Sequence, residues 1–188
     1  MIKKNTNIIL IFILSILFTS IIVFASIKIS TQYFKTHTFF YDPGMSHSRT
    51  FPFYERMQKE SQLNPIASRV NFAILWFKAD PRSVFLYVPT ILLCPKLMGT
   101  PYASMISVSF MLLGVLLVLA FSMYIRKHSL LFIISILLLF VSAPFLTNPE
   151  YGLAAGWHDL PASFFLASGI LSFLNWRYTN KLFWIFLS

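Results

Sequence analysis

The fold is decided by residues 5–27, NTNIILIFILSILFTSIIVFASI, a run of 23 residues without a formal charge. Isoleucine, leucine, phenylalanine and valine dominate this run, and Lys3 and Lys4 precede it. A helix of about 20 apolar residues crosses the hydrocarbon core of a bilayer, which is about 30 Å thick. The run therefore predicts a membrane-spanning helix over about residues 6–28.

The composition of the whole chain suits a bilayer better than water. Of its 188 residues, 57% are hydrophobic and only 11% are charged, and the mean hydropathy is +0.71. Soluble domains carry about 25% charged residues, which keep their surfaces hydrated. The net charge of +9 would suggest nucleic acid in a soluble domain, but here the charges lie mainly between apolar runs. Membrane topology explains them better, so we expect no nucleic-acid partner.

Three more uncharged runs are long enough to supply transmembrane helices. Pro101 and Pro144 should trim the ends of the first two, because proline cannot donate a backbone hydrogen bond. The predicted spans are about 102–125, 129–147 and 160–176. A final apolar run, 182–188, starts like a fifth span but is too short to cross. It is either a truncated helix or an interfacial tail anchored by Trp184, and both interpretations stay open.

The first helix has a competing interpretation as a signal peptide. Val23, Phe24 and Ala25 resemble a small-residue cleavage site after a basic start. Cleavage there would leave a three-helix protein. We prefer an uncleaved helix, because its apolar run exceeds the usual core of about 7 to 15 residues and because further spans follow.

Residues 83–95 are apolar, but they number only 13 between Arg82 and Lys96 and contain Pro89. If this segment does not span, one group of basic residues falls on a single side: Lys3, Lys4, Arg126, Lys127, Arg177 and Lys181. The short loop on the other side, 147–159, has no lysine or arginine. This is the positive-inside pattern, with the amino terminus cytoplasmic. The segment is therefore expected as a helix or re-entrant piece at the outer surface.

We predict an all-α, multi-pass transmembrane helical bundle that forms a single membrane domain over residues 1–188. Its outer loop, about 29–101, is rich in aromatic residues and should carry helices that lie on the membrane surface. Membrane lipid is the expected surrounding partner. The oligomeric state is not determined by these residues.

Polar residues on the outer side gather in two loops. Those that can carry chemistry are Asp42, His47 and Arg49 in the first loop, Glu150, His158 and Asp159 in the second, and Arg82 before the surface segment. A carboxylate beside the membrane can act as a base, a ligand of a divalent metal or a cation partner, and histidine can bind metal or move protons. Ordinary structural roles compete: Asp42 is a turn former before Pro-Gly, and Asp159 is a good helix cap.

Other common chemistries have no signature in the sequence. The chain has no glycine-rich phosphate loop of the Walker or dinucleotide kind and no Gly-x-Ser-x-Gly elbow. Cys94 is the single cysteine, so an internal disulfide and a cysteine-based zinc site are excluded.

Three features resemble the membrane glycosyltransferases of the GT-C type, which take a sugar from a polyprenyl-phosphate carrier. Asp42-Pro-Gly-Met-Ser-His47, in a long outer loop after one helix, is similar to an Asp-Ala-Leu-Ser-His-Trp segment of some members, although Ser48 stands in the place of Trp. The proline-bearing stretch 83–95 precedes the second helix. Gly156-Trp-His-Asp159-Leu-Pro161 resembles the Gly-Tyr-Ala-Asp-Leu-Pro segment that opens the fourth helix. The resemblance covers essentially this whole chain, but only the amino-terminal part of the family's length.

The resemblance implies that Asp42 deprotonates or orients the acceptor hydroxyl, with Asp159 as a second acid beside it. On position alone, and not from a family motif, Arg49 and Arg82 are expected to stabilise the departing carrier phosphate. The remaining expected substrate-binding residues are His47, Glu150 and His158. A polyprenyl-phosphate-linked sugar would be the donor. The expected location is the cell membrane, in bacteria the inner membrane. The alternative is a non-enzymatic multi-pass protein, either a transporter subunit or a scaffold.

Overall fold

The structure is a computed structural model, and it describes residues 2–33, 35, 55, 65–79, 84–98, 102–148, 159–182 and 184. These residues form helices and turns without a strand, which confirms the predicted all-helical class for this part of the chain. The elements in order are α1 (Ile2–Tyr33), α3 (Pro65–Ala79), α4 (Val84–Leu93), the 3-10 turn η2 (Pro95–Leu97), α5 (Met105–Ile125), α6 (Leu130–Val141), α7 (Pro144–Thr147) and α8 (Asp159–Thr179).

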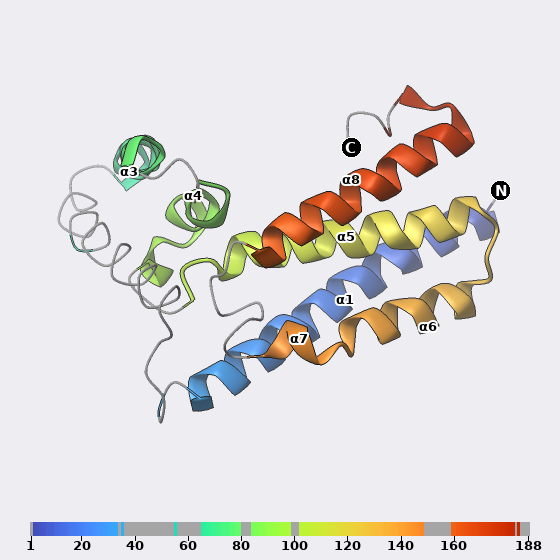
Figure 1. The fold of residues 1–188 in the computed structure, drawn as a ribbon, viewed down its shortest axis with the longest axis horizontal. Coiled ribbons are helices and arrows are strands. Elements are labelled where there is room, and N and C mark those ends of the chain that lie inside the picture. The colour runs from blue at the N-terminus through green and yellow to red at the C-terminus, as the bar shows by residue number, and fades with distance from the viewer. Residues whose placement is uncertain are drawn as a thin grey trace.

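Four of the helices, α1, α5, α6 and α8, run along the long axis of the molecule (Figure 1). Helix α5 is central, because it packs against α1, α4, α6 and α8. The chain begins at the end of the bundle where α5 ends, α6 begins and α8 ends, and we call this the proximal end. At the other end, the distal end, α1 ends while α5 and α8 begin.

Within the described residues, two helices are long and apolar enough to cross a membrane: Thr6–Tyr33 of α1 and Met105–Ile125, which is the whole of α5. The 21 residues of α5 extend about 32 Å at a rise of about 1.5 Å each. Helix α1 continues past Lys28, where the sequence predicts an end. A lysine side chain is flexible enough to keep its charge away from apolar surroundings, so Lys28 does not stop the helix. Helix α8 has the same length as α5 but is more polar, and it is not among the two helices that are apolar enough to cross a membrane. The predicted span over 160–176 therefore stays a prediction.

The stretch expected as one span over 129–147 forms two helices. Helix α6 begins with the Ser129 side chain accepting a hydrogen bond from the Phe132 backbone N–H, at 3.2 Å, and it ends at Val141. Ala143 then adopts an extended conformation, with φ −62° and ψ 120°, and Pro144 opens α7. A residue before proline is pushed away from helical geometry, and this restriction accounts for the break.

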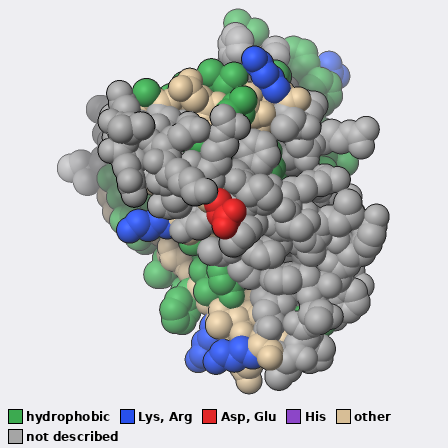
Figure 2. Space-filling view, turned by 90° about the vertical axis from the view of Figure 1, so that its left-hand side faces the viewer, with side chains coloured by type: hydrophobic (Ala, Val, Ile, Leu, Met, Phe, Trp, Pro, Cys, Tyr) green, Lys and Arg blue, Asp and Glu red, His purple; other side chains and the backbone are tan. Residues whose placement is uncertain are grey.

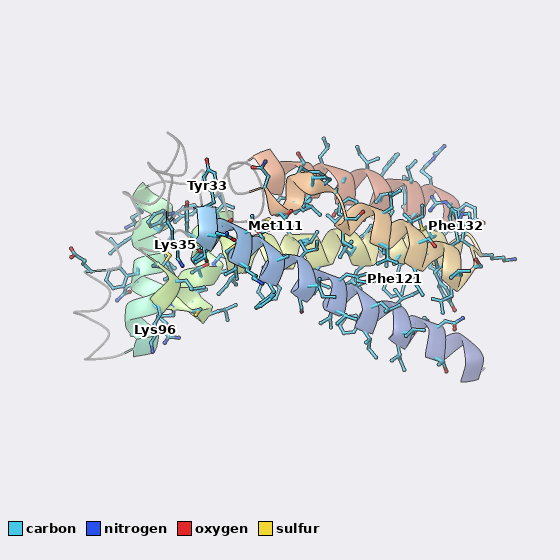
Figure 3. All side chains as sticks on the ribbon, turned by 90° about the horizontal axis from the view of Figure 1, so that it is seen from below. Tyr33, Lys35, Lys96, Met111, Phe121 and Phe132 are labelled. Atoms are coloured by element: carbon cyan, nitrogen blue, oxygen red, sulfur yellow. The ribbon has the colours of Figure 1, made fainter. Side chains whose placement is uncertain are left out.

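Helices α3 and α4 lie across the distal end and are seen almost end-on in Figure 1; in Figure 3 they again run across the bundle axis. The rings of Trp76 and Tyr87 join them, with centroids 4.9 Å apart. The Ser107 hydroxyl of α5 donates to the Leu86 carbonyl at 2.6 Å and ties α4 to the bundle. These contacts hold the ten residues of α4 across the end of the bundle. Pro89 lies inside this short helix.

The core follows one face of α5. Leu112, Leu116 and Ala120 are fully buried, and their spacing of four residues places them on one side of the helix. The outer surfaces of the bundle are also apolar: Phe24 on α1 is 70% exposed and Leu166 on α8 is 67% exposed. Helices that are apolar all round are typical of surroundings without water.

Candidate functional site

Helix α8 begins at Asp159, at the distal end of the bundle. Crosswise helices α3 and α4 and the end of α1 lie at this same end. Figure 2 looks onto it and shows lysine and arginine side chains toward the edges. An acidic residue in the first turn of a helix is stabilised by the positive end of the helix dipole. The distal end thus carries Asp159, the acidic residue of the segment 156–161 on which the family resemblance depends most.

Most of the predicted site lies outside the described residues. This holds for Asp42, His47, Arg49, Arg82, Glu150 and His158. Asp159 is described through its backbone, as the first residue of α8. The expected approach of Asp42 to Asp159 therefore stays a prediction.

An open apolar groove lies between α4, α5 and α8, with a volume of about 370 Å³. Its lining residues are Pro89, Ser107, Phe110, Met111, Gly114, Val118, Phe164, Phe165 and Ser168. The last three of these belong to the helix that begins at Asp159, and Phe164 lies on its second turn. None of these described lining residues is charged, so the groove suits a hydrocarbon chain better than a polar ligand.

Gly114 lines this groove in the middle of α5. A Cβ atom built at this position meets no other atom within 4 Å. Glycine inside a helix is less stable than alanine by about 0.5 to 1 kcal/mol. No steric conflict requires glycine here, so its consequence in the structure is the free space along the groove.

The sequence reasoning did not single out two lysines at the distal end of α1. Lys28 and Lys35, together with Thr31 and Gln32, line a second open cavity of about 750 Å³. Figure 3 shows Lys35 at the end of α1, on the side of the molecule where the crosswise helices lie. Lys28 lies within α1 and Lys35 in a turn after its end, so the two lysines line one cavity only because α1 continues to Tyr33, beyond the end that the sequence predicts.

No metal centre appears in the part of the chain that the structure describes, where no three histidine, cysteine or acidic side chains gather. The possible divalent metal therefore stays an expectation tied to His47, His158 and the loop acids. No protein-family model, curated protein or solved structure matches this chain.

Proposed function

We propose that this chain is a multi-pass membrane protein of the GT-C glycosyltransferase type that transfers a sugar from a polyprenyl-phosphate carrier. One observation carries the proposal: α8 begins at Asp159 beside the crosswise helices, and the same helix then lines an apolar groove. A lipid-linked sugar needs these two parts together, a polar reaction site at the membrane surface and an apolar channel for its hydrocarbon tail.

The bilayer placement follows from the same topology. If α1 and α5 cross the membrane, the proximal end, with its basic residues and its short connection between α5 and α6, is cytoplasmic. The distal end, with Asp159, is then the non-cytoplasmic end. Helices α3 and α4 would lie in the interface, where the apolar face of a crosswise helix is stable.

The reaction would begin with a carboxylate, Asp42 or Asp159, accepting the proton of an acceptor hydroxyl. The hydroxyl oxygen forms a bond to the anomeric carbon of the sugar, and the bond between that carbon and the carrier phosphate oxygen breaks. The electron pair leaves with the phosphate, whose charge Arg49 and Arg82 stabilise. His47, Glu150 and His158 would hold the sugar and the acceptor.

The test is transfer of radiolabelled sugar from a polyprenyl carrier in membranes that contain the full chain. Removing a general base should lower transfer at least about 100-fold, so Asp42→Asn and Asp159→Asn should abolish most of it without a change in protein abundance. Gly114→Leu should fill the groove and weaken carrier binding. Gly114→Ala is its matched control, because one methyl group meets open space and should leave transfer intact.

A second function, that of a scaffold or transporter subunit, is favoured by the exposed apolar faces. Helix α8 packs chiefly on α5 and leaves Phe165, Ile170 and Phe173 about half exposed. Such a face can receive further helices as well as lipid. Wild-type membranes without transfer above an empty-vector background, or aspartate variants with unchanged transfer, would favour this function over the enzyme.

A further inference from the structure

A further cavity, distinct from the two described above, lies at the proximal end, opposite the proposed transfer site. Its volume is about 570 Å³, and it is formed where α5 and α8 end. The lining residues are Tyr124, Ile125, Lys127, His128, Thr179, Lys181 and Trp184. Two of these carry a full positive charge, and three carry rings. The cavity therefore combines cations with side chains that are stable at a membrane interface.

The positive charges at this cavity have no acidic partner nearby in the chain. All six acidic residues occur at positions 42 to 159, and residues 81–149 and 160–188, which supply every lining residue, contain none. Lys127 and Lys181 are exposed, and neither ammonium group makes a hydrogen bond or ion pair with the described residues. Within the described residues no carboxylate pairs with them, so both lysines are available to an anion from outside the chain.

A purely structural role for cations at a helix end is already filled by Arg126. Its guanidinium donates to the Ser122 carbonyl of the last turn of α5 at 2.9 Å and to the Asn175 side-chain oxygen of α8 at 3.0 Å. It also lies over the Tyr178 ring, 5.4 Å from the centroid. These bonds satisfy the helix end, so compensation of the helix dipole does not require Lys127 and Lys181 in addition.

The backbone at Lys127 is unfavourable for a lysine. Its φ is 62°, in the left-handed region that glycine occupies readily. Its N–H donates to the Tyr124 carbonyl at 3.0 Å, and the His128 N–H donates to the Met123 carbonyl at 3.2 Å. These two bonds form the Schellman ending of a helix, in which glycine is the usual residue at this position. Lysine at this position is strained, and strained residues are often functional, which suggests that the Lys127 side chain has a role at the cavity.

The aromatic residues give the ligand its apolar half. Trp184 is only 8% exposed, and its backbone N–H donates to the Lys181 carbonyl at 3.1 Å, so the turn after α8 fixes the position of Trp184 beside Lys181. Tryptophan and tyrosine are enriched at the level of lipid head groups. Basic pockets between helices on the cytoplasmic side commonly hold anionic lipid head groups.

From these observations we propose that the proximal cavity binds the phosphate of an anionic phospholipid, with Lys127 and Lys181 as the cations and Trp184 and Tyr124 against the glycerol and upper acyl chain. This site is separate from the sugar-transfer site. It requires that the proximal end lie at a membrane surface, but it does not require that the chain be an enzyme.

The experiment is native mass spectrometry of the full chain in detergent, titrated with phosphatidylglycerol or phosphatidylcholine. Wild type should bind phosphatidylglycerol at least about tenfold more tightly. Lys127→Gly and Lys181→Gln should each lower that affinity about fivefold, and the double variant about 25-fold. The control Lys96→Gln removes an exposed lysine at the distal end, which Figure 3 shows far from Phe132 and the proximal turn, and should change the affinity less than twofold.

Lys127→Gly also distinguishes binding from folding. Glycine relieves the left-handed strain, so this variant should melt at a higher temperature while it binds phosphatidylglycerol less tightly. Equal binding of the two lipids, unchanged affinity in Lys127→Gly, or an equal loss in Lys96→Gln would overturn the proposal. Complete displacement of phosphatidylglycerol by millimolar inorganic phosphate would show a site for free phosphate and would overturn the lipid assignment.

Discussion

Replacing Asn175 by alanine should weaken the contact between α5 and α8 more than any other single polar substitution in the described bundle. Asn175 is fully buried. Its amide nitrogen donates to the Ser122 hydroxyl at 2.6 Å, and its amide oxygen accepts from Arg126 at 3.0 Å. The Ser122 hydroxyl in turn donates to the Val118 carbonyl at 2.6 Å, so one side chain connects an arginine and a serine of the neighbouring helix.

The expected loss is the sum of two hydrogen bonds. A neutral bond contributes about 1 kcal/mol and a bond to a charged group about 1.5 kcal/mol or more, so Asn175→Ala should lower the free energy of unfolding by about 2.5 kcal/mol. Asn175→Asp keeps an acceptor for Arg126 but loses the donor to Ser122, and should cost about 1 kcal/mol. Equilibrium unfolding by SDS in mixed micelles measures both values.

The matched control is Ser135→Ala. The exposed Ser135 hydroxyl only donates to the Leu131 carbonyl of its own helix, so its removal should change the free energy by less than about 0.5 kcal/mol. A double-mutant cycle between Asn175→Ala and Ser122→Ala should give a coupling free energy of about 1 kcal/mol. A coupling near zero, or an Asn175→Ala variant as stable as the control, would refute the reasoning.

Further outcomes follow from the core, the buried hydroxyls and the topology. Leu112→Ala should lower the free energy of unfolding by about 3 kcal/mol in the same assay, because Leu112 is fully buried; a loss below about 1 kcal/mol would contradict its core position. Among the described residues, the buried hydroxyls of Ser26 and Ser30 have no hydrogen-bond partner, so alanine at either position should raise the free energy of unfolding by about 1 kcal/mol, and a decrease would indicate a partner. Single cysteines at Lys96 and Lys127, in an otherwise cysteine-free chain, should react with a membrane-impermeant maleimide from opposite sides; labelling of both from one side would rule out the proposed topology.

The long axial helices could be located from the sequence because an uncharged apolar run makes up most of each one. The two helices that are apolar enough to cross a membrane lie inside the first two predicted spans or extend them, and the short apolar stretch around Pro89 forms a helix that lies crosswise. The break before Pro144 could be predicted only in part. Proline shows where a helix can begin, but whether the chain bends there depends also on packing, which for α6 is against α1 and α5 and for α7 is against α1.

The contacts between helices could not be predicted. Asn175 lies 53 positions from Ser122 and 49 positions from Arg126 in the sequence. Nothing in the local sequence pattern indicates that these residues are neighbours. From the sequence, Lys127 contributes only to the positive-inside pattern, because a lysine does not indicate that its backbone is left-handed. The residues of the candidate transfer site are predictions from the sequence. Of these, only Asp159, at the start of α8, belongs to a described helix.

The sideways opening of the groove beside Gly114 has a kinetic consequence. Phe110 and Phe165 line it and are each more than half exposed. If the proposed polyprenyl carrier is the ligand, its isoprenoid tail would enter between α5 and α8 by diffusing within the leaflet, without passing through water. The encounter rate would then depend on how many carriers occupy each unit of membrane area, and dilution of the cytoplasm or the medium would leave it unchanged.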